Sequence, residues 1–182
     1  MGFEGPANLL EWVLLASGLA AFVVMGIGLQ KFFITPTPAE RQAILFQESA
    51  IAVAVLHCVG IITRDSPGDS WTVTGIALYV LAVALFLAAV EATGDVMLPR
   101  AFAASEAATP LLTNGVYRLF RHPVYLAYSL AWAAAPIATH SPTLGVTALI
   151  MIVLHVIAAR RQDRLLAERR GAEYRAYRRW WR

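Results

Sequence analysis

The stretch that decides the fold is NGVYRLFRHPVYLAYSLAW, residues 114–132, which begins with two arginines and a histidine and continues as an apolar, aromatic run. Pro123 suits the first position of a helix, because its missing N–H would have no helical partner there. His122 before it is restricted to an extended conformation. The stretch therefore predicts a helix that begins at Pro123 and enters a membrane from a charged interface.

The composition of the whole chain is that of a small integral membrane protein. Of its 182 residues, 58% are hydrophobic and 15% are charged, and the mean hydropathy is +0.59. Several apolar runs reach the roughly 20 residues that a helix needs to cross about 30 Å of hydrocarbon. Spans are predicted at residues 9–32, 43–62, 71–92, 123–139 and 144–159.

These runs predict an all-α, polytopic membrane helical bundle of about five transmembrane helices, followed by an amphipathic C-terminal helix in the cytoplasm. We expect one membrane domain, residues 1–182. Its N-terminal three-helix part is residues 1–92, and residues 93–182 carry the motifs described below.

Basic residues predict the orientation. Lys31 and Arg41 lie between the first two spans, three arginines lie between the third and fourth, and nine lie at positions 160–182; only Arg64, in the loop RDSPGDS, lies on the other side. The positive-inside rule then places the N-terminus outside and the C-terminus in the cytoplasm. Many alanines and one lysine against fourteen arginines suggest a GC-rich coding sequence and hence a bacterial inner membrane.

The pI near 9.4 could also indicate nucleic-acid binding. However, the basic residues flank the spans and alternate with Trp and Tyr, as in an interfacial segment, so the expected partners are membrane lipids and not nucleic acid. The single cysteine, Cys58, permits no intrachain disulfide and no cysteine-based metal cage, and no metal site is predicted. The sequence makes no prediction of the oligomeric state.

The charged start of the 123–139 helix is a candidate anion site. A helix N-terminus presents free N–H groups and about half a positive charge, and Arg118, Arg121 and His122 add donors there. Alternatively, the arginines extend to lipid head groups and His122 fills a turn. Along the same helix, Tyr128 and Trp132 follow Tyr125 at i+3 and i+7, forming an aromatic stripe that could attract a sulfonium or ammonium group or could simply pack.

The last predicted span carries a second set of polar residues. His155 is ionisable within a membrane span, which favours a functional role. Gln162 lies about 20° from it on a helical wheel, with Asp163 alongside. Asp163 could accept hydrogen bonds from ribose hydroxyls or an amino group, or it could pair with a neighbouring arginine of the segment ARRQDR; the sequence leaves both open.

Two separated motifs carry a resemblance to a known family. TNGVYRLFRHPVYLAY, followed about forty residues later by RRQDRLLAERRGAEYRAYRRWWR, resembles the isoprenylcysteine carboxyl methyltransferase and phospholipid methyltransferase superfamily. That family shows G-x-Y-R, R-H-P-x-Y and, after a helical hairpin, E-E-x-x-L-x-x-x-F-G-x-E-Y-x-x-Y. The matching residues are Gly115, Tyr117, Arg118, Arg121, His122, Pro123, Tyr125, Leu166, Gly171, Glu173, Tyr174 and Tyr177, whereas the paired acids become Gln162 and Asp163 and the phenylalanine becomes Arg170.

The resemblance implies an integral membrane methyltransferase that uses S-adenosylmethionine, bound on the cytoplasmic side between the last two spans and the C-terminal segment. Its substrate would be an amphipathic, lipid-like acceptor, such as an isoprenylcysteine carboxylate-like group or another lipophilic nucleophile. Alternatives are a phospholipid amine as acceptor, a sterol-type membrane reductase that uses NADPH, or a non-catalytic membrane scaffold. The expected cofactor-binding residues are Tyr117, Arg118, Arg121, His122, Pro123, Tyr125, Tyr128, Gln162, Asp163 and Tyr174, and His155 and Arg161 are expected to orient the acceptor.

Overall fold

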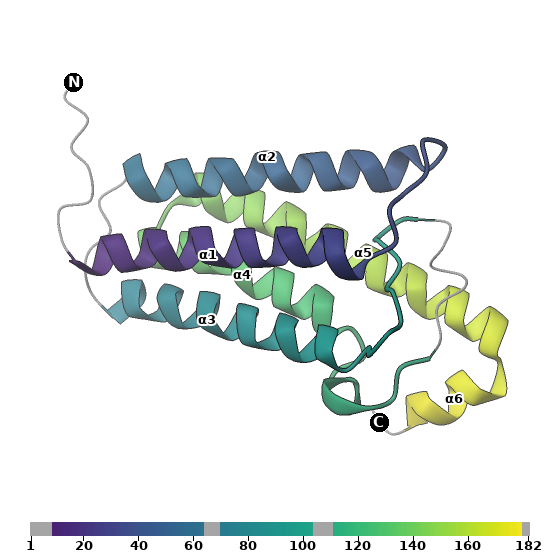
Figure 1. Ribbon diagram of the computed structural model, residues 1–182. Coiled ribbons are helices and arrows are strands. Elements are labelled where there is room, and N and C mark those ends of the chain that lie inside the picture. The colour runs from purple at the N-terminus through teal and green to yellow at the C-terminus, as the bar shows by residue number, and fades with distance from the viewer. Residues whose placement is uncertain (1–8, 64–69, 104–110, 180–182) are drawn as a thin grey trace.

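The computed structural model describes residues 9–63, 70–103 and 111–179 (Figure 1). Those residues form an all-helical bundle, and their only β-type pairing is an isolated bridge between Phe33 and Leu98. The elements are α1 (Leu9–Phe32), α2 (Arg41–Thr63), α3 (Ser70–Glu91), the 3₁₀ turn η2 (Gly115–Arg118), α4 (Pro123–Thr139), α5 (Pro142–Arg170) and α6 (Ala172–Arg179).

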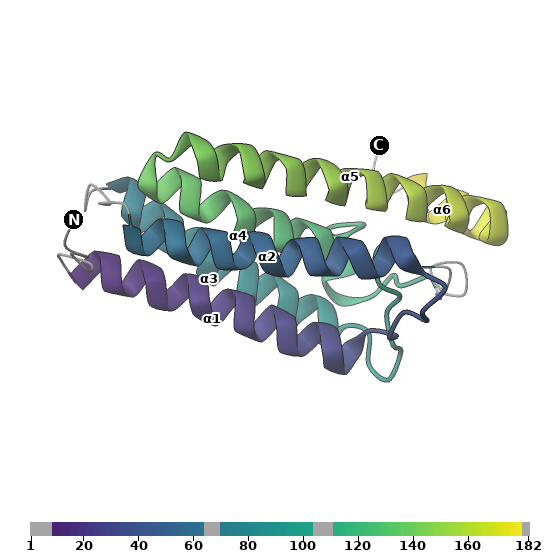
Figure 2. The ribbon, with the colours of Figure 1, turned by 90° about the horizontal axis from the view of Figure 1, so that it is seen from above.

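The first five helices run side by side along one axis, and α5 continues beyond the others at one end of the bundle (Figures 1 and 2). There α6 turns back from the end of α5 toward η2 (Figure 1). The α1–α2 connection and the start of α4 lie at the same end. We call it the α6 end, and the charged motifs of the sequence gather at it.

The outer surface of the bundle is apolar, as expected for an integral membrane protein. On α2, for example, Leu45, Ile51 and Val55 are each more than half exposed. A soluble protein would bury such side chains, whereas lipid tails solvate them. By length and composition, four of the described helices can cross a membrane, namely α1, α2, α3 and α5.

The remaining predicted span, α4, has the predicted bounds but is shorter than the other four helices. Its 17 residues cover about 26 Å at 1.5 Å per residue, slightly less than the hydrocarbon thickness of about 30 Å. It is also the helix with the most buried small residues, because it packs against both α3 and α5. These fully buried alanines are Ala127, Ala131, Ala134, Ala135 and Ala138.

Small side chains explain why α3 and α4 approach so closely. A Cβ atom on Gly75 of α3 would lie 2.6 Å from the Cβ of Ala138 and 2.9 Å from the carbonyl oxygen of Ala134. Only glycine fits at that contact. Helices in lipid associate through such close backbone packing, since lipid tails are as apolar as the side chains they replace.

The end of α5 differs from the prediction. The fall in hydropathy predicted that the helix ends at residue 159, but it continues to Arg170. The charged segment after residue 159 is rich in Arg, Gln, Leu, Ala and Glu, which are strong helix formers, so the helix persists outside the apolar stretch. It stops at Gly171, whose φ of +47° lies in the left-handed region that glycine adopts without strain.

Two backbone hydrogen bonds fix the segment that follows α3. The amide of Ile34 donates to the carbonyl of Leu98 at 2.8 Å, and the amide of Leu98 donates to the carbonyl of Phe32 at 2.9 Å. The segment therefore lies against the end of α1. Of the loop RDSPGDS, on which the predicted orientation partly depends, residues 64–69 lie outside the described residues.

Candidate functional site

The carboxylate of Asp163 on α5 joins the two sequence motifs. His122 Nε2 donates to its Oδ1 at 2.8 Å, Arg121 Nη1 donates to its Oδ2 at 3.2 Å, and the Tyr174 hydroxyl donates to Oδ1. The Arg121 and Asp163 side chains are 29% and 30% exposed. Because an ionised carboxylate only accepts hydrogen bonds, these donors stabilise its charged form.

The partner of Asp163 is not the one that its sequence neighbours suggested. The alternative from the sequence paired it with an arginine of ARRQDR, but its arginine is Arg121, at the start of α4. A helix directs residues one or two positions apart to different faces, so Arg161 and Arg164 point away from Asp163. Asp163 thus ties α5 to α4 and α6.

Tyrosines of α6 hold this short helix against the bundle. The Tyr177 hydroxyl donates to the carbonyl of Tyr117 in η2 at 2.8 Å, and Tyr174 is 2% exposed. Burial first, and then its hydrogen bond to the negative Asp163, raise the pKa of Tyr174 to about 12. Tyr174 therefore stays protonated and remains a donor at neutral pH.

A cavity lies between η2, the start of α4, the charged part of α5, and α6. Including its open mouth, it has a volume of about 630 Å³. We call it the polar cavity; its lining is Phe33, Leu98, Pro99, Leu111, Leu112, Tyr117, Arg121, His122, Pro123, Val124, Tyr125, Gln162, Asp163, Leu166, Tyr174 and Tyr177. It contains eight of the ten residues predicted from the sequence to bind a cofactor, all except Arg118 and Tyr128.

The start of α4 forms one wall of the polar cavity. Pro123 is the first helical residue, as predicted, and His122 is the N-cap with φ −128° and ψ 62°. The amides of the first helical turn have no partner within the helix, and the amide of Val124 belongs to this turn. This wall therefore offers an anion both backbone N–H groups and the nearby Arg121.

A second, apolar cavity adjoins the first deeper in the bundle. Its volume is about 780 Å³ including its opening, and we call it the apolar cavity. Its lining is Phe22, Met25, Gly26, Leu29, Phe33, Ala43, Phe46, Gln47, Ala50, Ile51, Ala54, Arg100, Ala101, Val124, Tyr125, Tyr128, Trp132 and His155. Phe33, Val124 and Tyr125 line both cavities, so the two spaces share this part of their walls.

Aromatic rings form the wall of the apolar cavity nearest the polar one. The rings of Tyr125 and His155 stack, with centroids 5.9 Å apart and an angle of 22° between their planes. Tyr128 and Phe46 contact the same imidazole, each with ring centroids 5.7 Å away. The predicted stripe of Tyr125, Tyr128 and Trp132 does line one cavity, and His155 faces it from α5.

The apolar cavity opens between α1 and α2. Gly26 of α1 and Ile51 of α2 line it and are also exposed on the surface of the bundle. A Cβ atom on Gly26 would meet no atom within 4 Å. A membrane-dissolved molecule could therefore enter from the side, between two helices that face lipid.

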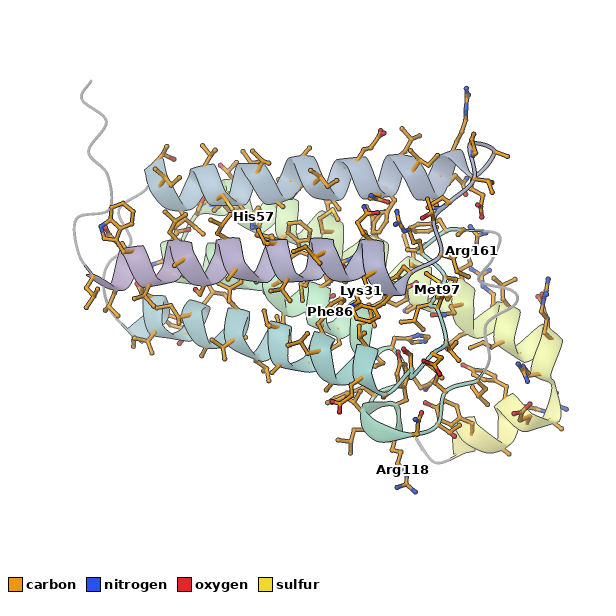
Figure 3. All side chains as sticks on the ribbon, in the orientation of Figure 1. Lys31, His57, Phe86, Met97, Arg118 and Arg161 are labelled. Atoms are coloured by element: carbon orange, nitrogen blue, oxygen red, sulfur yellow. The ribbon has the colours of Figure 1, made fainter. Side chains whose placement is uncertain are left out.

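Two predicted site residues, Arg118 and Arg161, line neither cavity, and Tyr128 lines the apolar cavity instead of the polar one. Arg118, at the end of η2, is exposed and points away from the bundle (Figure 3), because adjacent residues of a 3₁₀ turn diverge and Tyr117 points inward. Arg161 lies over the ring of Phe102 at 6.0 Å and lines neither cavity, since six positions turn it well away from His155. Tyr128 lies in the apolar cavity, where its hydroxyl donates to the Met25 carbonyl at 3.3 Å.

One residue of the apolar cavity, Arg100, was not predicted from the sequence. It is only 5% exposed, and its guanidinium bonds to Gln47, to Gln30 and to the carbonyl of Leu29. Its burial depends on segments more than 50 positions away, so no local pattern could reveal it. The signal available was a single arginine close to the end of a predicted span.

Comparison with known proteins identifies a family. Residues 31–180 match the family described as protein of unknown function (DUF1295). The chain belongs to this family. Every residue that lines the polar cavity falls within the DUF1295 match, whereas the apolar cavity also uses the part of α1 that precedes it. No curated protein and no solved structure matches the chain.

Proposed function

We propose that this protein is a membrane methyltransferase that uses S-adenosylmethionine to methylate an amphipathic, lipid-like acceptor. The observation that carries the proposal is the pair of adjoining cavities, one polar and one apolar, which share Phe33, Val124 and Tyr125 in their walls. A water-soluble cofactor and a membrane-dissolved acceptor need such a pair of spaces. The motif resemblance supports the same reaction.

The residues of the polar cavity suit the groups of this cofactor. Arg121 and the amides that begin α4 can donate to its carboxylate. Gln162 and the carboxylate of Asp163 can accept hydrogen bonds from its ammonium and ribose hydroxyls, since Arg121 is the one donor to Oδ2 of Asp163 among the described residues. The face of Tyr125 can attract a sulfonium.

The cofactor supplies an activated methyl group: the acceptor's nucleophile forms a bond to that carbon as the carbon–sulfur bond breaks, and the electron pair stays on sulfur. Such a displacement depends mainly on alignment and on removing water from the nucleophile. Tyr125 lies where the two cavities meet and would set that alignment. His155, stacked on Tyr125, would orient the acceptor from the apolar side.

The proposal also assigns the orientation of the chain. The α6 end would face the cytoplasm, where S-adenosylmethionine is available, and the opening between α1 and α2 would admit the acceptor from the bilayer. A carboxylate-like or other lipophilic nucleophile fits this route, and a phospholipid amine is the alternative acceptor.

Transfer of a labelled methyl group tests the proposal. Purified protein incubated with methyl-tritiated S-adenosylmethionine and a membrane lipid extract should carry tritium into the organic phase, and an Arg121→Gln variant should transfer far less. Arg118→Gln, which changes an exposed arginine outside both cavities, is the matched control. An unlabelled organic phase together with oxidation of added NADPH would instead assign a membrane reductase.

A further inference from the structure

Arg100 is a buried charge inside the apolar cavity. It lies in the segment after α3 that the Phe33–Leu98 bridge holds against α1. Its Nη1 donates to Gln47 Oε1, and its Nη2 donates to the Leu29 carbonyl at 3.2 Å and to Gln30 Oε1 at 3.3 Å. Its Nε is buried and has no hydrogen-bond partner.

None of these acceptors carries a negative charge. Among the described residues, no carboxylate forms an ion pair with Arg100, whereas Arg121 and Arg170 each have one. A buried cation without a counter-charge is costly, and proteins normally pair it or leave it out. Burial lowers the pKa of Arg100, because the charged guanidinium loses favourable contact with water.

Other buried polar atoms without partners are less costly. They belong to His57, Tyr79 and Trp132, none of which carries the permanent charge of a guanidinium. Arg100 is therefore the group in the described bundle whose burial most needs an explanation. A structural role explains part of this burial. Arg100 bonds to the Leu29 carbonyl in the last turn of α1 and to Gln47 of α2, and so links the two helices.

We infer that Arg100 binds the anionic head, a carboxylate or a phosphate, of the amphipath that occupies the apolar cavity. The guanidinium supplies a charge-assisted donor where the walls are mostly apolar, and the unpartnered Nε is a donor still to be satisfied. Naming this amphipath as the methyl acceptor rests on the proposed function; the anion site itself does not.

The position of Arg100 also sets the direction of the bound molecule. Its partners Gln30 and Gln47 each lie one helical turn from Gly26 and Ile51, the residues at the opening between α1 and α2. A head group at Arg100 therefore places the tail beside that opening and in contact with lipid. Arg100 lines the same cavity as Tyr125, and its chain neighbour Pro99 lines the polar cavity, from which a methyl group would be delivered.

Three probes with one alkyl chain test the inference: dodecanoate, dodecyl phosphate and dodecanol. Radiolabelled dodecanol bound to the protein in a neutral detergent is displaced by each unlabelled probe. For the wild-type protein, we expect at least one of the two anions to bind about tenfold or more tightly than dodecanol. The tighter of the two shows whether the site prefers a carboxylate or a phosphate.

Variants separate this role from a purely structural one. Arg100→Gln should lose the preference for the anions while still binding dodecanol, Arg100→Lys should keep most of it, and Arg118→Gln should behave as wild type. A structural role would weaken all three probes equally. Equal affinity of the wild-type protein for the anions and dodecanol would overturn the inference without need of any variant.

Titration of the same wild-type preparation with S-adenosylhomocysteine keeps this inference apart from the proposed function. Binding of S-adenosylhomocysteine without any preference for anionic probes would refute the role of Arg100 alone. Preference for anionic probes without binding of S-adenosylhomocysteine would refute the methyltransferase and leave the anion site standing.

Discussion

Asp163 and His122 are 41 positions apart in the chain, yet His122 Nε2 lies 2.8 Å from Asp163 Oδ1. One acid of α5 thereby fixes the residue that caps α4. The same carboxylate holds Arg121 and Tyr174, so the two motifs of the sequence form one connected structure at the α6 end. Its removal should affect both the cavity and the position of α6.

Replacing Asp163 with asparagine should weaken cofactor binding and lower the melting temperature. An amide has nearly the same shape but no charge, and one of its two polar atoms is a donor that would face Arg121 or His122. We expect a loss of about 1.5 to 3 kcal/mol in the binding free energy of S-adenosylhomocysteine, measured by calorimetry. Glu168→Gln, an exposed change on the same helix, is the control. Normal binding by Asp163→Asn would remove this residue from the site.

The two arginines of the first motif should differ in how much each contributes to cofactor affinity. Arg121 lines the polar cavity and Arg118 is exposed, so Arg121→Gln should raise the dissociation constant for S-adenosylhomocysteine roughly tenfold or more, while Arg118→Gln should leave it unchanged. Both variants should melt at similar temperatures, since both positions are at least partly exposed. Unchanged affinity in both variants would mean that these arginines interact with lipid head groups only.

Filling the opening between α1 and α2 should exclude the acceptor but not the cofactor. Gly26→Leu adds a side chain where nothing lies within 4 Å, so the helix should tolerate it. We expect methyl transfer to lipid to fall by at least about tenfold while binding of S-adenosylhomocysteine stays normal, on the reasoning that access and not chemistry is blocked. Gly145→Leu on α5, also with open space around it but outside both cavities, is the matched control. Full activity of Gly26→Leu would place the acceptor's route elsewhere.

The Tyr177 hydroxyl should contribute to the docking of α6. Tyr177→Phe removes its hydrogen bond to the Tyr117 carbonyl and leaves the ring in place, at a cost of about 0.5 to 1.5 kcal/mol. Faster hydrogen exchange at the α6 amides would report this loosening, because the helix is short and depends on tertiary contacts. Arg175→Gln, an exposed change in the same helix, should leave the exchange rates as they are. Unchanged exchange in Tyr177→Phe would show that ring packing and the Tyr174–Asp163 hydrogen bond hold α6 without this bond.

Much of the fold follows from local sequence signals. Pro123 predicted the start of α4, and the apolar run predicted both ends of α1, because each signal acts within a single helix. The extension of α5 was missed because hydropathy reports where a helix leaves lipid and not where it ends. Gly171 was the better signal for that end.

The residues of the candidate site, likewise, could be predicted only where local helix geometry decides their position. Residues close to the helix start, such as Arg121 and His122, could be selected because the helix geometry directs them to one place. Arg118 lies outside both cavities, since the direction of a side chain in a 3₁₀ turn depends on which neighbour is buried. Arg100 could not be found at all, because its burial arises from the packing of α1 and α2 around a loop.

Calorimetric titration of the purified, detergent-solubilised protein with S-adenosylhomocysteine tests the central claim most directly, with NADPH titrated in parallel. The account predicts one saturable binding event for S-adenosylhomocysteine, weakened in Arg121→Gln and unchanged in Arg118→Gln, and no binding of NADPH. Absence of heat from S-adenosylhomocysteine in folded wild-type protein, or saturable binding of NADPH in its place, would contradict the assignment of the polar cavity to this cofactor.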